Sequence, residues 1–249
     1  MKTAWLRLYA ELNDFLPPRT RQQTLAHSFV GRTSVKDAIE AQGVPHTEID
    51  VILVNGQSVD FSYLLDDGDR VSVYPVFEAF DIQPLTRLRR EPLRVVRFVL
   101  DGHLGRLAAY LRLAGFDTAY QTDCGDEELA RTSAETHRIL LTRDLALLKR
   151  SKVTHGYWVR ATVPREQLVE VLRRFDLARL VNPFARCVRC NGNLQPATLA
   201  AVADRVPPRI RDTFVEFAVC ADCQHVYWKG SHHARMTTLL AEAIESARR

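Results

Sequence analysis

Residues 98–150 read FVLDGHLGRLAAYLRLAGFDTAYQTDCGDEELARTSAETHRILLTRDLALLKR, and this stretch decides the fold. Short apolar runs alternate here with segments in which apolar residues recur every three or four positions. We predict strands at 95–100, 116–121, 138–142 and 157–161, with helices between them and a further helix from Pro164. Strands that alternate with helices form a parallel sheet with right-handed crossovers. The sequence therefore predicts an α/β domain with a parallel sheet.

Acidic residues follow three of these predicted strands: Asp101, then Asp123 with Asp126, then Asp144. Because the carboxyl ends of parallel strands meet at one edge of a sheet, we expect these side chains to converge. Clustered carboxylates repel one another unless a cation lies among them, and Mg²⁺ or Mn²⁺ suits such an all-oxygen site. Such ions activate water and stabilise a leaving oxygen at phosphorus. The structural alternative is that Asp101 and Asp144 cap helices and that Asp126 favours a helix dipole.

Four of the five cysteines form two pairs, Cys187-x-x-Cys190 and Cys220-x-x-Cys223, with 29 residues between the pairs. Zinc takes four thiolates in a tetrahedron, and each CxxC turn presents two of them. All four positions are then filled by protein, so we expect a structural Zn²⁺ rather than a catalytic one. The long spacer predicts an inserted element, with a helix starting at Pro207 and Pro208.

The first 80 residues predict a separate unit. Strands are expected at 3–9, 22–30, 51–57 and from Arg70, with a capped helix from Thr33 that ends at Gly43. This order resembles a β-grasp, ubiquitin-like unit and the small sulfur-carrier proteins in particular. Those carriers end in Gly-Gly, whereas this strand continues into PVFEAFDIQP. We therefore expect a docking or scaffolding role, with a protein partner, and no sulfur-carrier activity.

Composition and charge narrow the class of protein. The chain has 249 residues, and no run approaches the roughly 18 apolar residues of a membrane span, so no membrane partner is expected. The N-terminus has no signal-peptide pattern, which makes the cytoplasm the expected location. Residues 1–85 hold 7 Lys/Arg and 12 Asp/Glu, a net charge of −5, and residues 86–249 hold 27 and 18, a net charge of +9. This asymmetry suggests a polyanion partner for the second part or, as the alternative, well-solvated helices.

Several motifs in the opening stretch resemble one family. They are the strand that ends in Asp101, the helix and strand LGRLAAYLRLAGFDT, the acidic turn DCGDEEL and the strand end ILLTRD. Together they resemble the PIN-like ribonuclease domain of the mutator-seven C-terminal family. The cysteine pairs and the following YWKGSH resemble that family's terminal zinc ribbon, and its prokaryotic members often carry a ubiquitin-like unit in front. One departure is His103, where an apolar residue is expected.

The resemblance implies the roles of several residues. The metal carboxylates of the family fall on Asp101, Asp126 and Asp144, with Asp123 or Glu127 as the fourth. A nuclease also needs cations that hold the phosphate backbone. Arg106 and Arg143 lie nearest to the acids in the sequence, so we expect them to bind RNA unless they are solvated or salt-bridged surface residues.

The sequence thus predicts four consecutive parts. These are a β-grasp domain at 1–80, a linker at 81–94, a PIN-like three-layer α/β/α domain at 95–182 and a zinc ribbon with a C-terminal helix at 183–249. The predicted function is metal-dependent hydrolysis of RNA, with the ribbon aiding RNA binding. Two alternatives remain open. One is a non-catalytic RNA-binding module, and the other is a protein-interaction adaptor built on the β-grasp domain.

Overall fold

The computed structural model describes residues 1–75 and 96–249. They form two compact units. The first unit holds residues 1–75 with Asp144–Trp158, and the second holds 96–143 with Val159–Arg249. The predicted linker at 81–94 and the stretch that follows the last N-terminal strand lie outside the described residues.

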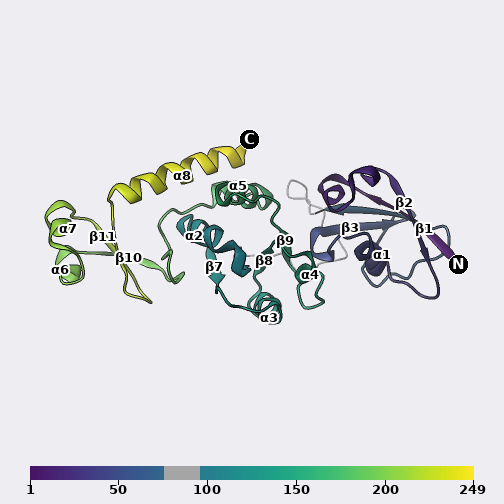
Figure 1. Cartoon of the computed structure of the whole chain (residues 1–249), viewed down its shortest axis with the longest axis horizontal. Helices are drawn as coiled ribbons and strands as arrows, with labels where there is room; N and C mark the ends of the chain where they lie inside the picture. Colours follow the sequence, from purple (N-terminus) through teal and green to yellow (C-terminus); the bar gives the residue numbers. More distant parts are fainter. Residues whose placement is uncertain (76–95) are drawn as a thin grey trace. The chain divides into compact units, whose positions relative to one another are not determined.

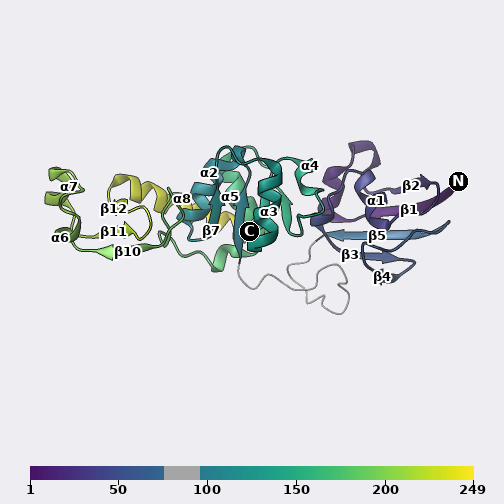
Figure 2. The same ribbon diagram turned by 90° about the horizontal axis from the view of Figure 1, so that it is seen from below.

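The N-terminal residues form a mixed five-stranded sheet of the β-grasp type (Figure 2). Its elements are β1 (Lys2–Leu8), η1 (Ala10–Phe15), η2 (Pro18–Thr20), β2 (Thr24–Phe29), α1 (Val35–Ala41), η3 (His46–Glu48), β3 (Ile49–Val54), β4 (Gln57–Val59) and β5 (Arg70–Pro75). The strand order is β2-β1-β5-β3-β4, with β1 and β5 parallel and the other pairs antiparallel. The sequence reading missed β4, which has three residues and no apolar alternation of its own.

Local signals explain two of these elements. Helix α1 begins where the Ser34 hydroxyl accepts a hydrogen bond from the backbone N–H of Asp37 at 3.1 Å, which is an N-cap. Strands β3 and β4 are joined by Asn55 and Gly56, which both have positive φ, as a tight hairpin turn requires. The apolar faces of α1 and the sheet then close over a buried core that includes Leu6, Ile39, Ile52 and Val73.

The segment Asp144–Trp158 belongs to the same compact unit. His46 Nε2 donates to the carbonyl oxygen of Val153 at 2.8 Å. The fully buried Glu48 accepts a hydrogen bond at its Oε1 from the Trp158 backbone N–H at 2.7 Å, and the Trp158 ring lies 5.2 Å from that of Phe15. Polar and apolar contacts therefore fix this segment against the β-grasp sheet and its η3 turn.

The second sheet contains the parallel strands predicted from the opening stretch. Its elements are β6 (Arg97–Leu100), η4 (Gly102–Leu104), α2 (Gly105–Leu113), β7 (Asp117–Tyr120), α3 (Asp126–Thr136), β8 (Ile139–Thr142), α4 (Leu145–Leu148), β9 (Gly156–Trp158), α5 (Pro164–Arg174) and η5 (Leu177–Arg179). The strand order is β7-β6-β8-β9, and β6 is parallel to both β7 and β8. In Figure 1, α2 and α5 lie on one face of the sheet and α3 lies on the other.

The C-terminal elements form a small antiparallel sheet and a long helix. They are β10 (Leu194–Ala197), α6 (Leu199–Val202), α7 (Pro208–Thr213), β11 (Phe217–Cys220), β12 (Val226–Trp228) and α8 (Ser231–Arg248), with sheet order β10-β11-β12. The element expected between the cysteine pairs is the helix pair α6 and α7. This insertion supplies apolar contacts of its own, because Val202 and Val206 pack with Phe217 and Val226 in a separate core.

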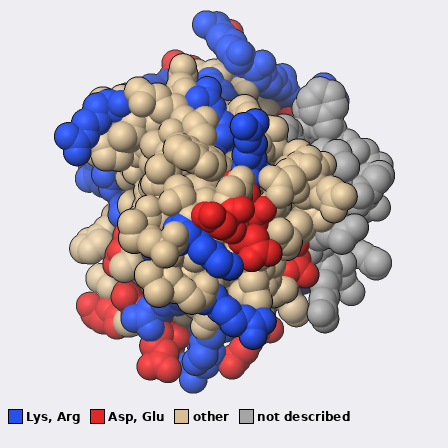
Figure 3. Space-filling model, turned by 90° about the vertical axis from the view of Figure 1, so that its right-hand side faces the viewer, with Lys and Arg blue, Asp and Glu red and all other residues tan. Residues whose placement is uncertain are grey.

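The surface of the described residues carries charges of both signs. On the face drawn in Figure 3, acidic side chains gather in several places with lysines and arginines between them. None of the helices in residues 1–75 and 96–249 combines the length and the apolar character needed to cross a membrane.

Candidate functional site

The end of β6 places Asp101 against the end of β8. The register pairs Leu100 with Leu141, and the Asp101 backbone N–H donates to the Leu141 carbonyl oxygen at 3.1 Å. The hydroxyl of the buried Thr142 then donates to Asp101 Oδ2 at 2.8 Å. Asp101 is half-buried, so one carboxylate oxygen is held by the sheet while the side chain still reaches the surface.

The turns after β6 and β7 lie in direct contact. A side-chain carbon at Gly102 would lie 2.6 Å from the carbonyl oxygen of Thr122, and one at Gly105 would lie 2.6 Å from the hydroxyl of Tyr120. That hydroxyl donates to the Gly102 carbonyl oxygen at 2.9 Å. The two glycines of DGHLG therefore permit an approach that side chains would block. As a result, the acidic loop after β7 lies beside the turn that carries Asp101.

Three further acids occupy that loop and the helix after it. Asp123, Asp126 and Glu127 are exposed, and Asp126 is the first residue of α3. Asp126 thus has the first-turn position that favours the helix dipole, which was the structural alternative for this residue. Because the Asp126 side chain is exposed, its position is compatible both with this helix-dipole role and with metal binding.

Asp144 lies two residues beyond the end of β8 and is exposed. Its Oδ1 accepts a hydrogen bond from the Ala146 backbone N–H at 2.7 Å, which makes Asp144 the N-cap of α4. Asp101 holds the equivalent position before η4 but makes no side-chain capping bond. The capping alternative is therefore realised at Asp144 and not at Asp101.

Within residues 1–75 and 96–249, one group of three or more Cys, His, Asp or Glu has its ligand atoms within 4.8 Å of one another, and it consists of the four paired cysteines. The acids at the strand ends are not gathered to that distance. The divalent-cation site of Asp101, Asp126 and Asp144 stays a prediction, as does the choice of Asp123 or Glu127 as a fourth ligand.

The two arginines expected to bind RNA have different surroundings. Arg143 Nη1 donates to the carbonyl oxygens of Val159, Arg160 and Ala161 at 3.1, 2.8 and 2.7 Å, so this guanidinium braces the chain that follows β9. Arg106 is exposed on α2 and pairs with no carboxylate in the part of the chain that the structure describes. Both roles toward RNA remain predictions, and Arg106 is the more available of the two.

The four cysteines have the geometry of a structural zinc site. Their sulfurs lie within 4.8 Å of one another, with Cys187 3.6 Å from Cys223 and Cys190 3.3 Å from Cys220. Four sulfurs about 2.3 Å from a central zinc are about 3.8 Å apart, so this spacing fits the ion. All five cysteines of the chain are free thiols, which is the state that zinc requires.

The electrostatics of the thiols also fit a metal cation. Burial raises the pKa of the Cys187 thiol, but hydrogen bonds from the Tyr227 hydroxyl and from backbone N–H groups of the CxxC turn lower it to about 7. A backbone hydrogen bond at His225 lowers the pKa of Cys223, yet burial and the neighbouring sulfurs together raise it to about 12. One thiolate therefore forms readily, while four close thiolates need a cation among them.

A buried polar network joins the first CxxC turn to strand β7. Arg112, which is 6% exposed, donates from Nε to the Thr118 carbonyl oxygen at 2.9 Å. Its Nη1 donates to the carbonyl oxygens of Val188 and Arg189 at 3.1 Å each. The residue after the turn, Asn191, accepts from the Thr118 backbone N–H at 2.9 Å. The cysteine turn is thus hydrogen-bonded to the parallel sheet.

Asp117 completes this network at the start of β7. Its Oδ1 accepts hydrogen bonds from Arg138 at 2.6 Å and from Asn191 at 2.7 Å, and Arg186 lies 3.7 Å from its Oδ2. Burial alone would raise the pKa of Asp117, but these partners outweigh burial and hold the pKa below its usual value. A charged Asp117 is therefore part of the native structure.

Sequence reasoning did not predict the contacts of Thr142, Arg112, Asp117 or Asn191. Thr142 carries a weak signal, since a polar residue that ends an apolar strand at a candidate site is available to bind a neighbouring acid. The other three act through partners up to 77 residues away, and no local pattern marks such pairs.

Fold and site together define a ubiquitin-like unit joined to an α/β domain with acids at its strand ends and a four-cysteine knot. Residues 96–240 match the family model of the Mut7-C RNAse domain, and residues 1–81 match that of the Mut7-C ubiquitin domain. The first match spans more than half of the chain, so the chain belongs to the Mut7-C RNAse domain family. The resemblance drawn from the sequence motifs is thereby confirmed.

No curated protein matches the chain. Among solved structures, two crystal structures of small archaeal modifier protein 1 from Haloferax volcanii are similar to it. They share 19% and 18% identity with this chain, cover 30% and 31% of it and 98% and 99% of their own lengths, and each has a TM-score of 0.25.

Proposed function

We propose that this protein is a metal-dependent ribonuclease that hydrolyses RNA phosphodiester bonds. The observation that carries the proposal is the edge of the parallel sheet, where Asp101 is held by Thr142 beside the acidic loop after β7, in a chain of a ribonuclease-domain family. In this proposal Asp101, Asp126 and Asp144 provide the carboxylates for Mg²⁺ or Mn²⁺, with Asp123 or Glu127 as a fourth.

The residues of the chain have distinct roles in this proposal. A bound divalent ion supplies an activated water and stabilises the charge that develops on the leaving oxygen. Thr142 fixes one oxygen of Asp101, so the carboxylate keeps its orientation when RNA approaches. Arg106 neutralises a phosphate next to the scissile bond. Zn²⁺ on the four cysteines has a structural role, and the ribbon adds contacts to RNA.

The test is cleavage of labelled single-stranded RNA with Mn²⁺ or Mg²⁺ by the zinc-loaded full chain. Asp101→Asn and Asp144→Asn each remove one charged oxygen ligand and keep the side-chain shape, so turnover should fall about 100-fold or more. Glu135→Gln is the matched control, because Glu135 is an exposed acid near the end of α3 and lies outside the proposed site. Near-full metal-dependent cleavage by Asp101→Asn or Asp144→Asn would refute the proposal.

A second variant tests the support of Asp101. Thr142→Val keeps the buried volume of the side chain but removes the donor to Asp101 Oδ2. Loss of such a supporting hydrogen bond weakens metal affinity about 10- to 100-fold, so the Mn²⁺ concentration needed for half-maximal cleavage should rise by that factor. An unchanged Mn²⁺ requirement would show that the Thr142 hydrogen bond does not contribute to metal binding.

The same measurements separate the ribonuclease from a non-catalytic RNA-binding module. The binder would bind RNA without Mn²⁺-dependent cleavage, and its affinity for Mn²⁺ would be insensitive to Asp101→Asn. For the β-grasp unit we propose a role in protein contacts without sulfur-carrier chemistry, and a thiocarboxylate detected on this protein would contradict it.

A further inference from the structure

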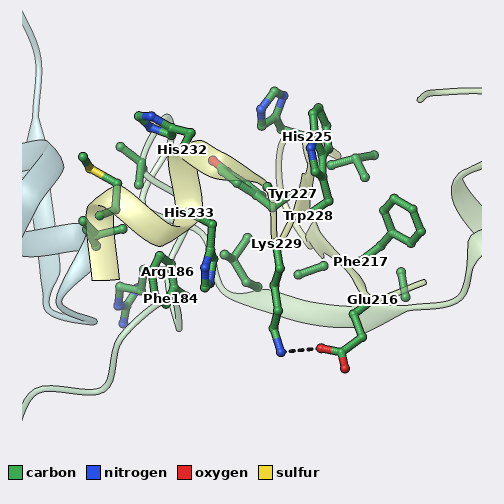
Figure 4. Close-up of a pocket in the computed structure, with 18 of the residues that line it drawn as sticks. Phe184, Arg186, Glu216, Phe217, His225, Tyr227, Trp228, Lys229, His232 and His233 are labelled. Atoms are coloured by element: carbon green, nitrogen blue, oxygen red, sulfur yellow. Dashed lines mark ion pairs between the residues drawn. The ribbon is translucent and has the colours of Figure 1, made fainter. Parts of the chain in front are cut away.

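A large groove lies between helix α2 and the ribbon sheet, beside the beginning of α8 (Figure 4). It is lined by residues within 106–113, 184–199, 215–218 and 225–236, all of which belong to the second compact unit. We call it the ribbon groove. Its volume of about 1280 Å³ exceeds the roughly 300–1000 Å³ of a typical small-molecule pocket. The ribbon groove therefore has room for several units of an extended polymer.

The charge of the ribbon groove is predominantly positive. Its lining holds Arg106, Arg186, Arg189 and Lys229, whereas Glu216 is its one acidic residue. Glu216 forms an ion pair with Lys229, drawn as a dashed line in Figure 4, so these two charges offset each other. The guanidinium of Arg186 is likewise balanced by Asp117 at 3.7 Å.

Two cations of the ribbon groove have no acidic partner among the described residues. Arg106 is exposed on α2 with no ion pair, and Arg189 is exposed in the first CxxC turn. Arg189 Nη1 lies 3.3 Å from His225 Nδ1, which can accept a hydrogen bond but carries no negative charge. These two guanidinium groups are the ones available to an anionic ligand, and each can bind a phosphate through two donors.

Flat aromatic side chains also line the ribbon groove. Trp228 is half-buried, packs against the small ribbon core and lines the ribbon groove. In Figure 4, Trp228 and Tyr227 extend from the same strand, while Phe184 lies near His233 of α8. The rings of Phe184 and His233 are stacked 4.1 Å apart. A base that entered the ribbon groove would thus meet ring surfaces large enough to stack on.

We propose that the ribbon groove binds single-stranded RNA, with a base stacked on Trp228 and phosphates held by Arg106 and Arg189. Alternating flat bases and negative phosphates match both features of the groove, and an acidic peptide matches the cations alone. The choice of RNA rests on the proposed ribonuclease function. Arg106 is the second residue of α2, which begins four residues after Asp101, so RNA in the groove would lead toward the acidic edge.

The experiment measures binding separately from cleavage. Fluorescence anisotropy of a labelled 12-nucleotide oligouridine is followed with the zinc-loaded full chain that carries Asp101→Asn, without added Mg²⁺ or Mn²⁺. Arg106→Ala and Trp228→Leu are introduced on this background. Arg235→Ala is the matched control, because Arg235 is an exposed arginine of α8 that does not line the groove. Zinc content and circular dichroism are recorded for every variant.

We expect Trp228→Leu to raise the Kd about tenfold, because one base loses its stacking surface. Arg106→Ala should also raise the Kd and should reduce the slope of log K against log salt concentration by about 0.7, the value for one phosphate contact on a single strand. Arg235→Ala should leave the Kd within about twofold. If Trp228→Leu loses zinc, Arg106→Ala decides the test, because Arg106 is exposed and forms no ion pair with the other described residues.

An unchanged Kd and salt slope in Arg106→Ala would overturn the proposal. Displacement of the RNA by polyglutamate at equal charge concentration would also overturn it, because that result marks a general anion site. A 12-base-pair RNA duplex that bound as tightly as the single strand would exclude stacking and overturn it as well. RNA binding that depends on the groove in a chain that cleaves no RNA would keep this proposal and refute the ribonuclease one.

Discussion

Replacement of Arg112 by methionine tests how much this side chain contributes to holding the four-cysteine knot on the parallel sheet. Arg112 is 6% exposed and connects three carbonyl oxygens, those of Thr118 in β7 and of Val188 and Arg189 in the cysteine turn. Methionine keeps the unbranched apolar stem of the side chain but has no guanidinium group, so it introduces no new polar group at the buried site. The variant therefore removes all three hydrogen bonds together with the buried charge.

The structure sets the size of the effect. A hydrogen bond from a charged donor contributes about 1.5–3 kcal/mol, and a buried acceptor left without a donor costs about 1–3 kcal/mol. The Thr118 backbone is inaccessible to water, so we assign about 2 kcal/mol to its oxygen. Val188 and Arg189 share one donor nitrogen and lie nearer the surface, so together they add about 1 kcal/mol. We expect Arg112→Met to lower the free energy of unfolding by about 3 kcal/mol.

The assay is urea unfolding of the zinc-loaded chain together with the rate of zinc release to a coloured chelator. The release rate should rise in Arg112→Met, because the turn between Cys187 and Cys190 loses its hydrogen bonds from Arg112 to Val188 and Arg189. Arg131→Met is the control, since Arg131 is exposed on α3 and its nearest acid, Glu128, is 3.8 Å away. A loss below about 1 kcal/mol with unchanged zinc release would refute this account of how the knot is held.

Three further outcomes follow from the same structure. Cys187→Ser should lower bound zinc and expose the ribbon to protease, and full zinc occupancy in the Cys187→Ser, Cys220→Ser double variant would contradict the site. Because the pKa of Asp117 is lowered in the folded state, its carboxylate stabilises the fold above about pH 4, and this stability is lost as the pH falls through the folded-state pKa. The urea midpoint of the wild type should therefore approach that of Asp117→Asn as the pH is lowered into this range. Glu48→Ala, which removes the acceptor of the Trp158 N–H, should cost about 2–3 kcal/mol in urea unfolding, and a loss under 1 kcal/mol would show that this contact is dispensable.

Apart from β4, the strand–helix order of the β-grasp unit and of the parallel sheet could be predicted from the sequence because its signals are local. Apolar runs mark the strands of the parallel sheet, and Ser34 marks the start of α1 through a bond to a residue three positions away. The same holds for the cysteine knot, whose ligand pairs are close in the sequence. The sequence also predicted that β6, β7 and β8 are parallel, and the register confirms it. Because the strands are parallel, the acids that follow them lie at the same edge of the sheet.

Contacts between distant residues could not be predicted in this way. Arg112 and Asn191 are each one polar residue in an otherwise ordinary local pattern, and their partners lie on elements that the sequence treats as separate. The proposed division at residue 182 separates the ribbon from the parallel sheet, although Arg112, Asp117 and Asn191 bind the two together. Composition can indicate where a linker lies, but it does not reveal hydrogen bonds between the parts on either side of the boundary.

The ubiquitin-like unit makes contacts with a segment far from it in the sequence. It belongs to one compact unit with Asp144–Trp158, the segment that begins with a carboxylate proposed to bind metal. Lys149 donates from Nζ to the Glu40 carbonyl oxygen at 3.0 Å, and His46 and Glu48 hold the rest of the segment through backbone groups. These contacts hold the segment that contains α4 against the β-grasp unit, and Asp144 is the N-cap of that helix. A protein-contact role of the β-grasp unit would therefore have to leave the surface that holds Asp144–Trp158 in place.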